Sequence, residues 1–173
     1  NLFDLELETV KDEITGRERL VLNIENKVED VTQSLLTMAK GSTRSKDVNE
    51  LTKQIIAESV AQEYAAIGIT SNVESLYADN NIRNNDYLGR KKKEMPTIGS
   101  WYRRILIKEK ENDNPDYTKH YSYLTKVMKQ YIREYNGQMA YFDGQSTFDL
   151  LESSPFINLD ISQLEEKFAN PLA

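Results

Sequence analysis

The spacing of the apolar side chains constrains the fold of this chain more than any other feature. Across most of residues 24–135 these side chains recur every three or four residues, which places them on one face of an α-helix. The first such face comprises Ile24, Val28, Val31, Leu35 and Met38. The last comprises Tyr117, Tyr121, Leu124, Met128, Tyr131 and Tyr135. The pattern predicts a mainly α protein in which several amphipathic helices bury their apolar faces in a shared core.

Glycine and capping residues mark the limits of the first two predicted helices. Gly41 is expected to end the first helix, and Gly68 to end the second. The N-cap of the second helix is expected to be Ser42, Thr43 or Ser45. The apolar positions of this second helix are Val48, Leu51, Ile55, Ile56, Val60, Tyr64 and Ile67.

A polar, interrupted stretch separates the second helix from the third. Within residues 69–96, one or two helical turns are predicted at residues 72–79, and the remainder is expected to form turns and loop. Pro96 and Thr97 then begin a helix that extends to about Lys110. The inward positions of this third helix are Ile98, Trp101, Ile105 and Leu106.

The last helix of the periodic region has the clearest start signal. Asn114 followed by Pro115 is typical of an N-cap with proline in the first helical position, and Gly137 is expected to end this helix. A further helix is predicted near the end of the chain, from a cap at Ser162 through Phe168.

Short strands are predicted only near the two ends of the chain. Residues 2–7 alternate apolar and polar side chains, residues 19–23 do so less regularly, and residues 15–17 read as a turn between them. This pattern indicates a short edge hairpin or an extended arm. Toward the C-terminus, residues 139–142 and 156–159 are predicted to form two more strands.

These elements predict a mainly α fold, with a helical bundle-like subdomain and short β-strands at both termini. The expected division of the chain has three parts. Residues 1–23 form an extended arm with edge strands, and residues 24–137 form the helical subdomain. Residues 138–173 form a strand, a turn, a second strand and a helix.

The composition argues against several kinds of site. The net charge of -6 and the isoelectric point near 5.0 argue against a general nucleic-acid-binding domain. The chain has no cysteine, which excludes disulfides, thiolate metal ligands and a cysteine nucleophile. None of its seven glycines precedes a lysine, so it has no phosphate-binding loop of the Walker A type. No apolar run is long enough to span a membrane, no signal peptide is visible, and both ends read as fragment boundaries.

Two residues resemble parts of catalytic sites, and both have simpler interpretations. His120 is the only histidine, and the sequence offers it no carboxylate or nucleophile partner, so a packed or surface histidine is favoured. Asp160 follows an apolar stretch as the aspartate of a Walker B strand would, but Ile161 stands where a catalytic glutamate would follow. A structural strand end is therefore favoured. No catalytic, cofactor-binding or metal-binding residue is predicted in this chain.

One cluster of basic residues is a candidate contact for a partner or for single-stranded nucleic acid. Trp101 and Tyr102 lie in its sequence neighbourhood, and aromatic rings beside cations can stack on bases. The alternative, which is favoured, is a solvated loop beside a helix whose Trp101 belongs to the core. The candidate contact residues are Arg90, Lys91, Lys92, Lys93, Arg103 and Arg104.

Three segments together resemble one protein family. They are Asn1-Leu2-Phe3-Asp4-Leu5; Leu36-Thr37-Met38-Ala39-Lys40-Gly41-Ser42-Thr43-Arg44 with Asn49-Glu50-Leu51-Thr52 and Tyr64; and Phe142-Asp143-Gly144-Gln145-Ser146-Thr147 with the stretch from Phe156 to Glu166. Their order is similar to that in the VirB-four (TraE/TraC) class of conjugative-transfer, or type IV secretion, ATPases. The forms most similar are those of conjugative elements, including conjugative transposons, of Gram-positive bacteria. The first segment resembles an "NPFDL" element with Leu2 in place of proline, and the resemblance is weakest over residues 69–113.

The resemblance implies that the chain is the all-helical insert of such an ATPase, flanked by short strands of its RecA-like α/β motor domain. In the family the Walker A loop precedes the first segment and the Walker B strand follows the last. The parent protein would therefore bind ATP and Mg²⁺, and this fragment would hold no cofactor. The resemblance also implies a homo-oligomeric parent, cytoplasmic and at the inner face of the cell membrane, whose partners are other secretion components.

Two functions of different classes follow from these observations. The first is a non-catalytic helical portion of a conjugative-transfer ATPase that relays motion or contacts partners during export of DNA or protein. The alternative is a stand-alone helical module that binds a protein or single-stranded nucleic acid.

Overall fold

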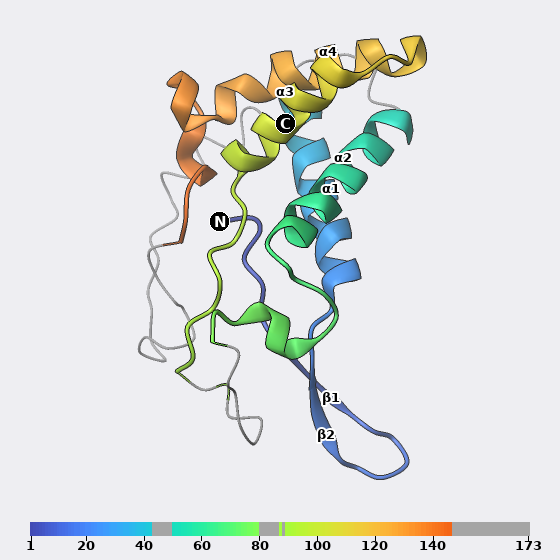
Figure 1. Cartoon of the computed structure of the whole chain (residues 1–173), viewed down its shortest axis with the longest axis vertical. Helices are drawn as coiled ribbons and strands as arrows, with labels where there is room; N and C mark the ends of the chain where they lie inside the picture. The colour runs from blue at the N-terminus through green and yellow to red at the C-terminus, as the bar shows by residue number, and fades with distance from the viewer. Residues whose placement is uncertain (43–49, 80–86, 88, 147–173) are drawn as a thin grey trace.

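The periodic apolar positions meet in one core between four α-helices. The computed structural model describes residues 1–42, 50–79, 87 and 89–146 (Figure 1). Within these ranges the helices are α1 (Ile24–Ser42), α2 (Glu50–Ala66), α3 (Ile98–Glu111) and α4 (Pro115–Val127). The strands β1 (Glu8–Lys11) and β2 (Glu18–Val21) form a two-stranded antiparallel sheet. The described part of the chain is therefore mainly helical, as the apolar spacing predicted.

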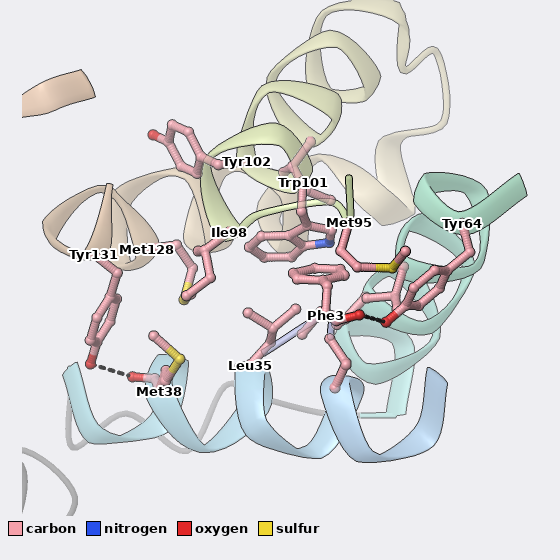
Figure 2. Packing of buried hydrophobic residues seen from close by; sticks show 14 of the residues in the cluster. Phe3, Leu35, Met38, Tyr64, Met95, Ile98, Trp101, Tyr102, Met128 and Tyr131 are labelled. Atoms are coloured by element: carbon pink, nitrogen blue, oxygen red, sulfur yellow. Dashed lines mark hydrogen bonds between the residues drawn. The ribbon is translucent and has the colours of Figure 1, made fainter. Parts of the chain in front are cut away.

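Aromatic side chains from different elements fill the centre of this core (Figure 2). The Trp101 indole N–H donates a hydrogen bond to Ser59 Oγ at 2.7 Å, which ties α3 to α2. The Tyr131 hydroxyl donates to the Met38 carbonyl at 3.1 Å, which ties the chain after α4 to α1. Each ring thus buries a large apolar surface while its polar atom finds a partner. The largest fully buried side chains are Trp101, Tyr64, Tyr131, Phe3, Leu35, Ile56, Leu76, Ile98, Ile105, Leu124, Met128 and Ile132.

Local capping explains where two of the helices begin. Thr97 is the N-cap of α3, where its hydroxyl accepts from the Ser100 N–H and the Ser100 hydroxyl accepts from the Thr97 N–H. Asn114 is the N-cap of α4, and Pro115 occupies its first turn. The capping box at Thr97, and the Asn114 side chain that accepts from the Asp116 N–H, satisfy backbone donors that a helix cannot satisfy itself, so both predicted starts are confirmed.

Other boundaries follow the sequence less closely. Gly68 follows the end of α2 with φ of +75°, as expected of a helix stop. Gly41 does not end the first helix, because α1 continues through it to Ser42. The predicted helical turns in the polar stretch are present as a 3₁₀-helix, η1 (Val73–Leu76). The predicted N-cap residues Thr43 and Ser45 lie outside the described residues.

The helix predicted from Pro115 to Gly137 is shorter than its apolar stripe. α4 stops at Val127 and is followed by two 3₁₀-helices, η2 (Met128–Tyr131) and η3 (Arg133–Tyr135). A 3₁₀-helix has three residues per turn, so side chains that are spaced to share one face of an α-helix no longer all point toward the core. Tyr135 is consequently 40% exposed, and its prediction as an inward residue is wrong.

The N-terminal hairpin is present, but its first strand is displaced along the sequence. β1 begins at Glu8, so the prediction of a strand at residues 2–7 is wrong. The alternation there has another cause, because Phe3 and Leu5 are buried against the helices. In the described structure no strand pairs with residues 2–7. A strand requires pairing as well as alternation.

The tip of the hairpin is organised by Asp12. Its carboxylate accepts hydrogen bonds from the Ile14 and Thr15 N–H groups at 2.8 and 2.9 Å. These bonds, that of Thr15 first, hold the pKa of Asp12 below its ordinary value. The turn predicted at residues 15–17 is thus part of a larger ordered loop.

The predicted strand at residues 139–142 is also wrong. Ala140–Phe142 form the 3₁₀-helix η4, which precedes the buried Asp143. The second predicted strand at residues 156–159, and the helix expected from Ser162, lie outside the described residues. No helix in the described ranges combines the length and the apolar character that crossing a membrane requires.

Two isoleucines on α3 provide a matched test of this core. Ile105 is 0% exposed and Ile107 is 55% exposed. We expect Ile105→Ala to lower the free energy of unfolding by about 2–5 kcal/mol, because it leaves a cavity among packed side chains. Ile107→Ala should change it by less than about 0.5 kcal/mol. Chemical denaturation monitored by circular dichroism measures both, and equal losses would contradict the described packing.

Candidate functional site

Three of the four cations in the basic run after the polar stretch have acceptors within the fold. Arg90 pairs with Asp79 at 3.0 Å, and Lys92 pairs with Glu6 at 2.6 Å. The Lys93 ammonium donates to the Ile67 carbonyl at 3.0 Å, just beyond the end of α2. Three of the four predicted contact residues in this run therefore hold other parts of the chain in place.

The two arginines on α3 differ from each other. Arg104 Nε lies 2.5 Å from the buried Glu63 carboxylate, which also accepts from the Ser100 hydroxyl at 2.7 Å. Arg103 is exposed, as is Lys91 in the basic run. Since Arg90, Lys92 and Arg104 already pair with carboxylates, about half of the predicted positive charge here is compensated within the fold.

The aromatic residues near these cations are not available for stacking. Trp101 is fully buried and Tyr102 is nearly so. Burial raises the pKa of Tyr102 to about 12, with smaller contributions from Tyr135 and Glu109, and its hydroxyl donates to the Thr125 carbonyl at 2.6 Å. The interpretation of Trp101 as a core residue is confirmed. Base stacking requires an exposed ring face, so the structure does not favour a nucleic-acid site at these residues.

His120 is a packed histidine, as its surroundings in the sequence indicated. It is buried on α4, and its Nδ1 lies 2.9 Å from the Thr52 hydroxyl on α2. Within the part of the chain that the structure describes, no group of three or more histidine and carboxylate residues is arranged to hold a metal ion.

A different set of polar contacts joins the segments that lead into and out of the helical body. We call residues 1–5, 95–99 and 143–146 the end clasp. The Ser146 hydroxyl donates to the Asp4 carboxylate, and the Asn1 side-chain amide donates to the Pro96 carbonyl at 2.8 Å. The Gln145 side-chain amide donates to the Met95 carbonyl at 2.6 Å. Residues 1–5 and residues 143–146 therefore lie side by side at one edge of the helices (Figure 1).

Asp143 is the centre of the end clasp. Its side chain is only 7% exposed, and its two carboxylate oxygens accept from the Gly99 N–H at 2.8 Å and the Arg133 N–H at 2.7 Å. Gly99 lies in the first turn of α3, where free backbone donors and the helix dipole favour a negative charge. Because a buried carboxylate is costly without such donors, Asp143 is tied to both α3 and the chain after α4.

Phe3 anchors the other side of the end clasp in the core. Its ring lies 5.9 Å from the Tyr64 ring on α2, between centroids, and its carbonyl accepts from the Tyr64 hydroxyl at 2.8 Å. Burial, and to a lesser degree the charge of Asp4, raises the pKa of Tyr64 far above its ordinary value. The phenol therefore stays a protonated donor at pH values above the ordinary tyrosine pKa of 10.0.

The contacts of the end clasp position chain segments relative to one another. Its carboxylates and amides bind main-chain or hydroxyl partners, so they are already occupied. Sequence reasoning noted Asn1–Leu5 and Phe142–Thr147 as separate family-like segments but did not predict that they meet. Gly99 and Arg133 carried no signal at all, since they contribute only backbone N–H groups.

Comparisons of this chain with protein-family models, with curated proteins and with solved structures find no significant match.

The contact between Gly99 and Asp143 gives a prediction with an unusual sign. Alanine normally favours a helix over glycine by about 1 kcal/mol. A Cβ at position 99 would lie 2.9 Å from Asp143 Oδ1, which is too close. We therefore expect Gly99→Ala to destabilise the fold by about 1–2 kcal/mol, measured by chemical denaturation.

A double-mutant cycle isolates this effect. In an Asp143→Ala background the carboxylate is absent, so Gly99→Ala should become neutral or stabilising. An equal cost of Gly99→Ala in both backgrounds would show that some other contact is responsible.

The buried tyrosines predict late alkaline unfolding. The raised pKa values of Tyr64 and Tyr102 favour the neutral phenol in the folded state. Their contribution to stability is thus complete below the ordinary tyrosine pKa of 10.0 and is lost as pH rises toward about 12. Ultraviolet absorbance of phenolate should show a late fraction that titrates together with loss of helical circular dichroism. Titration of all tyrosines near pH 10, with the helices intact, would contradict this.

Proposed function

We propose that this chain is a non-catalytic helical module of a conjugative-transfer ATPase of the VirB-four class. There it relays nucleotide-driven motion or contacts other components of the secretion system. The observation that carries the proposal is the end clasp, which brings the segments on the two sides of the helical body together. A module inserted into another domain needs such adjacent ends, because its host continues from nearly the same point at which it was interrupted.

The contacts between the end clasp and the helices support a role in motion relay. Phe3 lies inside the core, and Asp143 is bonded to the first turn of α3, so neither segment can shift without moving packed groups. Packed elements move as units, and small displacements at one edge are passed to the far end of a helix. The helices would then act as a lever on a motor domain that lies elsewhere in the parent protein.

The remaining parts of the proposal rest on the family resemblance. The parent would bind ATP and Mg²⁺, form a homo-oligomer and work in the cytoplasm at the inner face of the cell membrane. The partners of this module would be the rest of that ATPase and other secretion components.

A protein-interaction module is the second candidate, and one observation favours it. The β1–β2 hairpin extends away from the helices (Figure 1). Ile14, in the loop between its two strands, is 96% exposed. Val10 and Leu20 on the two strands are also exposed. A projecting ribbon with exposed apolar side chains is suited to insertion into a groove of another protein.

The coding sequence on either side of this segment distinguishes the two candidates. We expect a G-x-x-x-x-G-K-[ST] loop upstream and an apolar strand that ends in Asp-Glu downstream, in the same reading frame. A start codon directly before Asn1 and a stop codon directly after Ala173 would discard the ATPase proposal and leave the interaction module.

The 173-residue chain itself should show no ATP hydrolysis. It has no phosphate-binding loop to hold the nucleotide, so phosphate release in the presence of Mg²⁺ and ATP should equal that of a protein-free control. Turnover above this control that Asp160→Ala abolishes would refute the assignment of a non-catalytic role.

A further inference from the structure

We propose that the end clasp is a latch whose two sides open and close together. In one state residues 143–146 are held against both residues 1–5, here called the arm, and α3, and in the other they are released from both. The inference rests on the proposed role in motion relay, and it identifies the contacts of residues 143–146 as the route by which motion passes between the arm and α3. Asp143 would thereby couple the contact of residues 143–146 with α3 to the contact of Ser146 with the arm.

The contacts of the latch lie on two short continuous stretches. Gln145 binds the carbonyl of Met95, and Asp143 binds the N–H of Gly99, so residues 143–146 run along residues 95–99 in the opposite direction. Residues joined so closely in sequence hold one another near their partners, so the release of one favours the release of the next. Once one bond of the stretch breaks, its neighbours lose the proximity that held them.

Each end of the latch also reaches a different part of the protein. Ser146 binds Asp4, one residue after the buried Phe3, and therefore connects the latch to the arm. Asp143 binds the N–H of Arg133, and therefore connects the latch to the chain after α4. A release that starts at the arm is thus transmitted to α3 and to the chain after α4 within four residues, 143–146.

Gly144 allows the chain to make these contacts in succession. Its φ of +150° is a conformation that residues with a side chain rarely adopt. This turn lies between Asp143, which binds the first turn of α3, and Ser146, which binds Asp4 of the arm. The latch is therefore built from a buried anchor, a glycine turn and an exposed hydroxyl contact.

Amide hydrogen exchange on the full chain, followed by nuclear magnetic resonance, tests whether the two sides are coupled. Ser146→Ala removes only an exposed hydroxyl and should leave the fold intact. We expect it to speed exchange of the Gly99 and Arg133 amides by roughly threefold or more, although neither amide touches Ser146. Ser122→Ala on α4 is the matched control and should leave both rates unchanged.

Coupling is reciprocal, so the opposite perturbation gives a second measurement. Asp143→Asn should speed exchange of the Phe3 and Asp4 amides of the arm, by roughly threefold or more. Asp113→Asn, in the exposed loop before α4, is its control. If Asp143→Asn does not fold, the result for Ser146→Ala decides alone.

The latch is overturned if Ser146→Ala changes exchange only in the arm and leaves Gly99 and Arg133 at their original rates. This outcome is independent of the proposed function. A Walker A loop upstream together with uncoupled exchange would retain the ATPase module and discard the latch. Coupled exchange in a chain with no such loop would retain the latch in a protein of another class.

Discussion

The insertion of Phe3 into the helical core is the interaction on which the rest of the structure depends. The ring is fully buried beside Tyr64, whose hydroxyl also binds the Phe3 carbonyl, so both the side chain and the main chain of this residue are fixed (Figure 2). Asp4 follows directly and is thereby held where Ser146 can reach it. The arm is consequently a part of the core, and the end clasp exists because the arm cannot drift from the helices.

Buried polar groups determine how the helices are aligned around this anchor. Apolar packing is non-directional and tolerates small rotations of one helix against another. Hydrogen bonds and ion pairs are directional. The bonds from Trp101 to Ser59 and from Arg104 to Glu63 do not tolerate such rotations, because each joins α3 to one turn of α2. A buried donor or acceptor that lost its partner would cost about 1–3 kcal/mol, so these pairs select one arrangement among many of similar apolar burial.

The sequence predicts features that depend on neighbouring residues and misses those that depend on distant ones. The spacing of Ile98, Trp101 and Ile105 and the caps at Thr97 and Asn114 are local, and the structure has them as predicted. The extended arm at residues 2–7 has the alternation of a strand, but its partner is a set of helices that the local pattern does not specify. Asp143 binds an N–H group 44 residues earlier, and a backbone donor leaves no trace in the sequence. The basic residues are likewise visible in the sequence, but the carboxylates that pair with Arg90, Lys92 and Arg104 are not.

The hairpin has a consequence for how a protein of this kind can evolve. No residue of β1 or β2 is buried, so substitutions there leave the packing of the helices untouched. Stability therefore places little selective constraint on this ribbon, whereas the arm that leads into it is held by Phe3 and Leu5. Lineages can exchange the sequence of the hairpin, and any binding preference that it carries, without first acquiring compensating changes in the core.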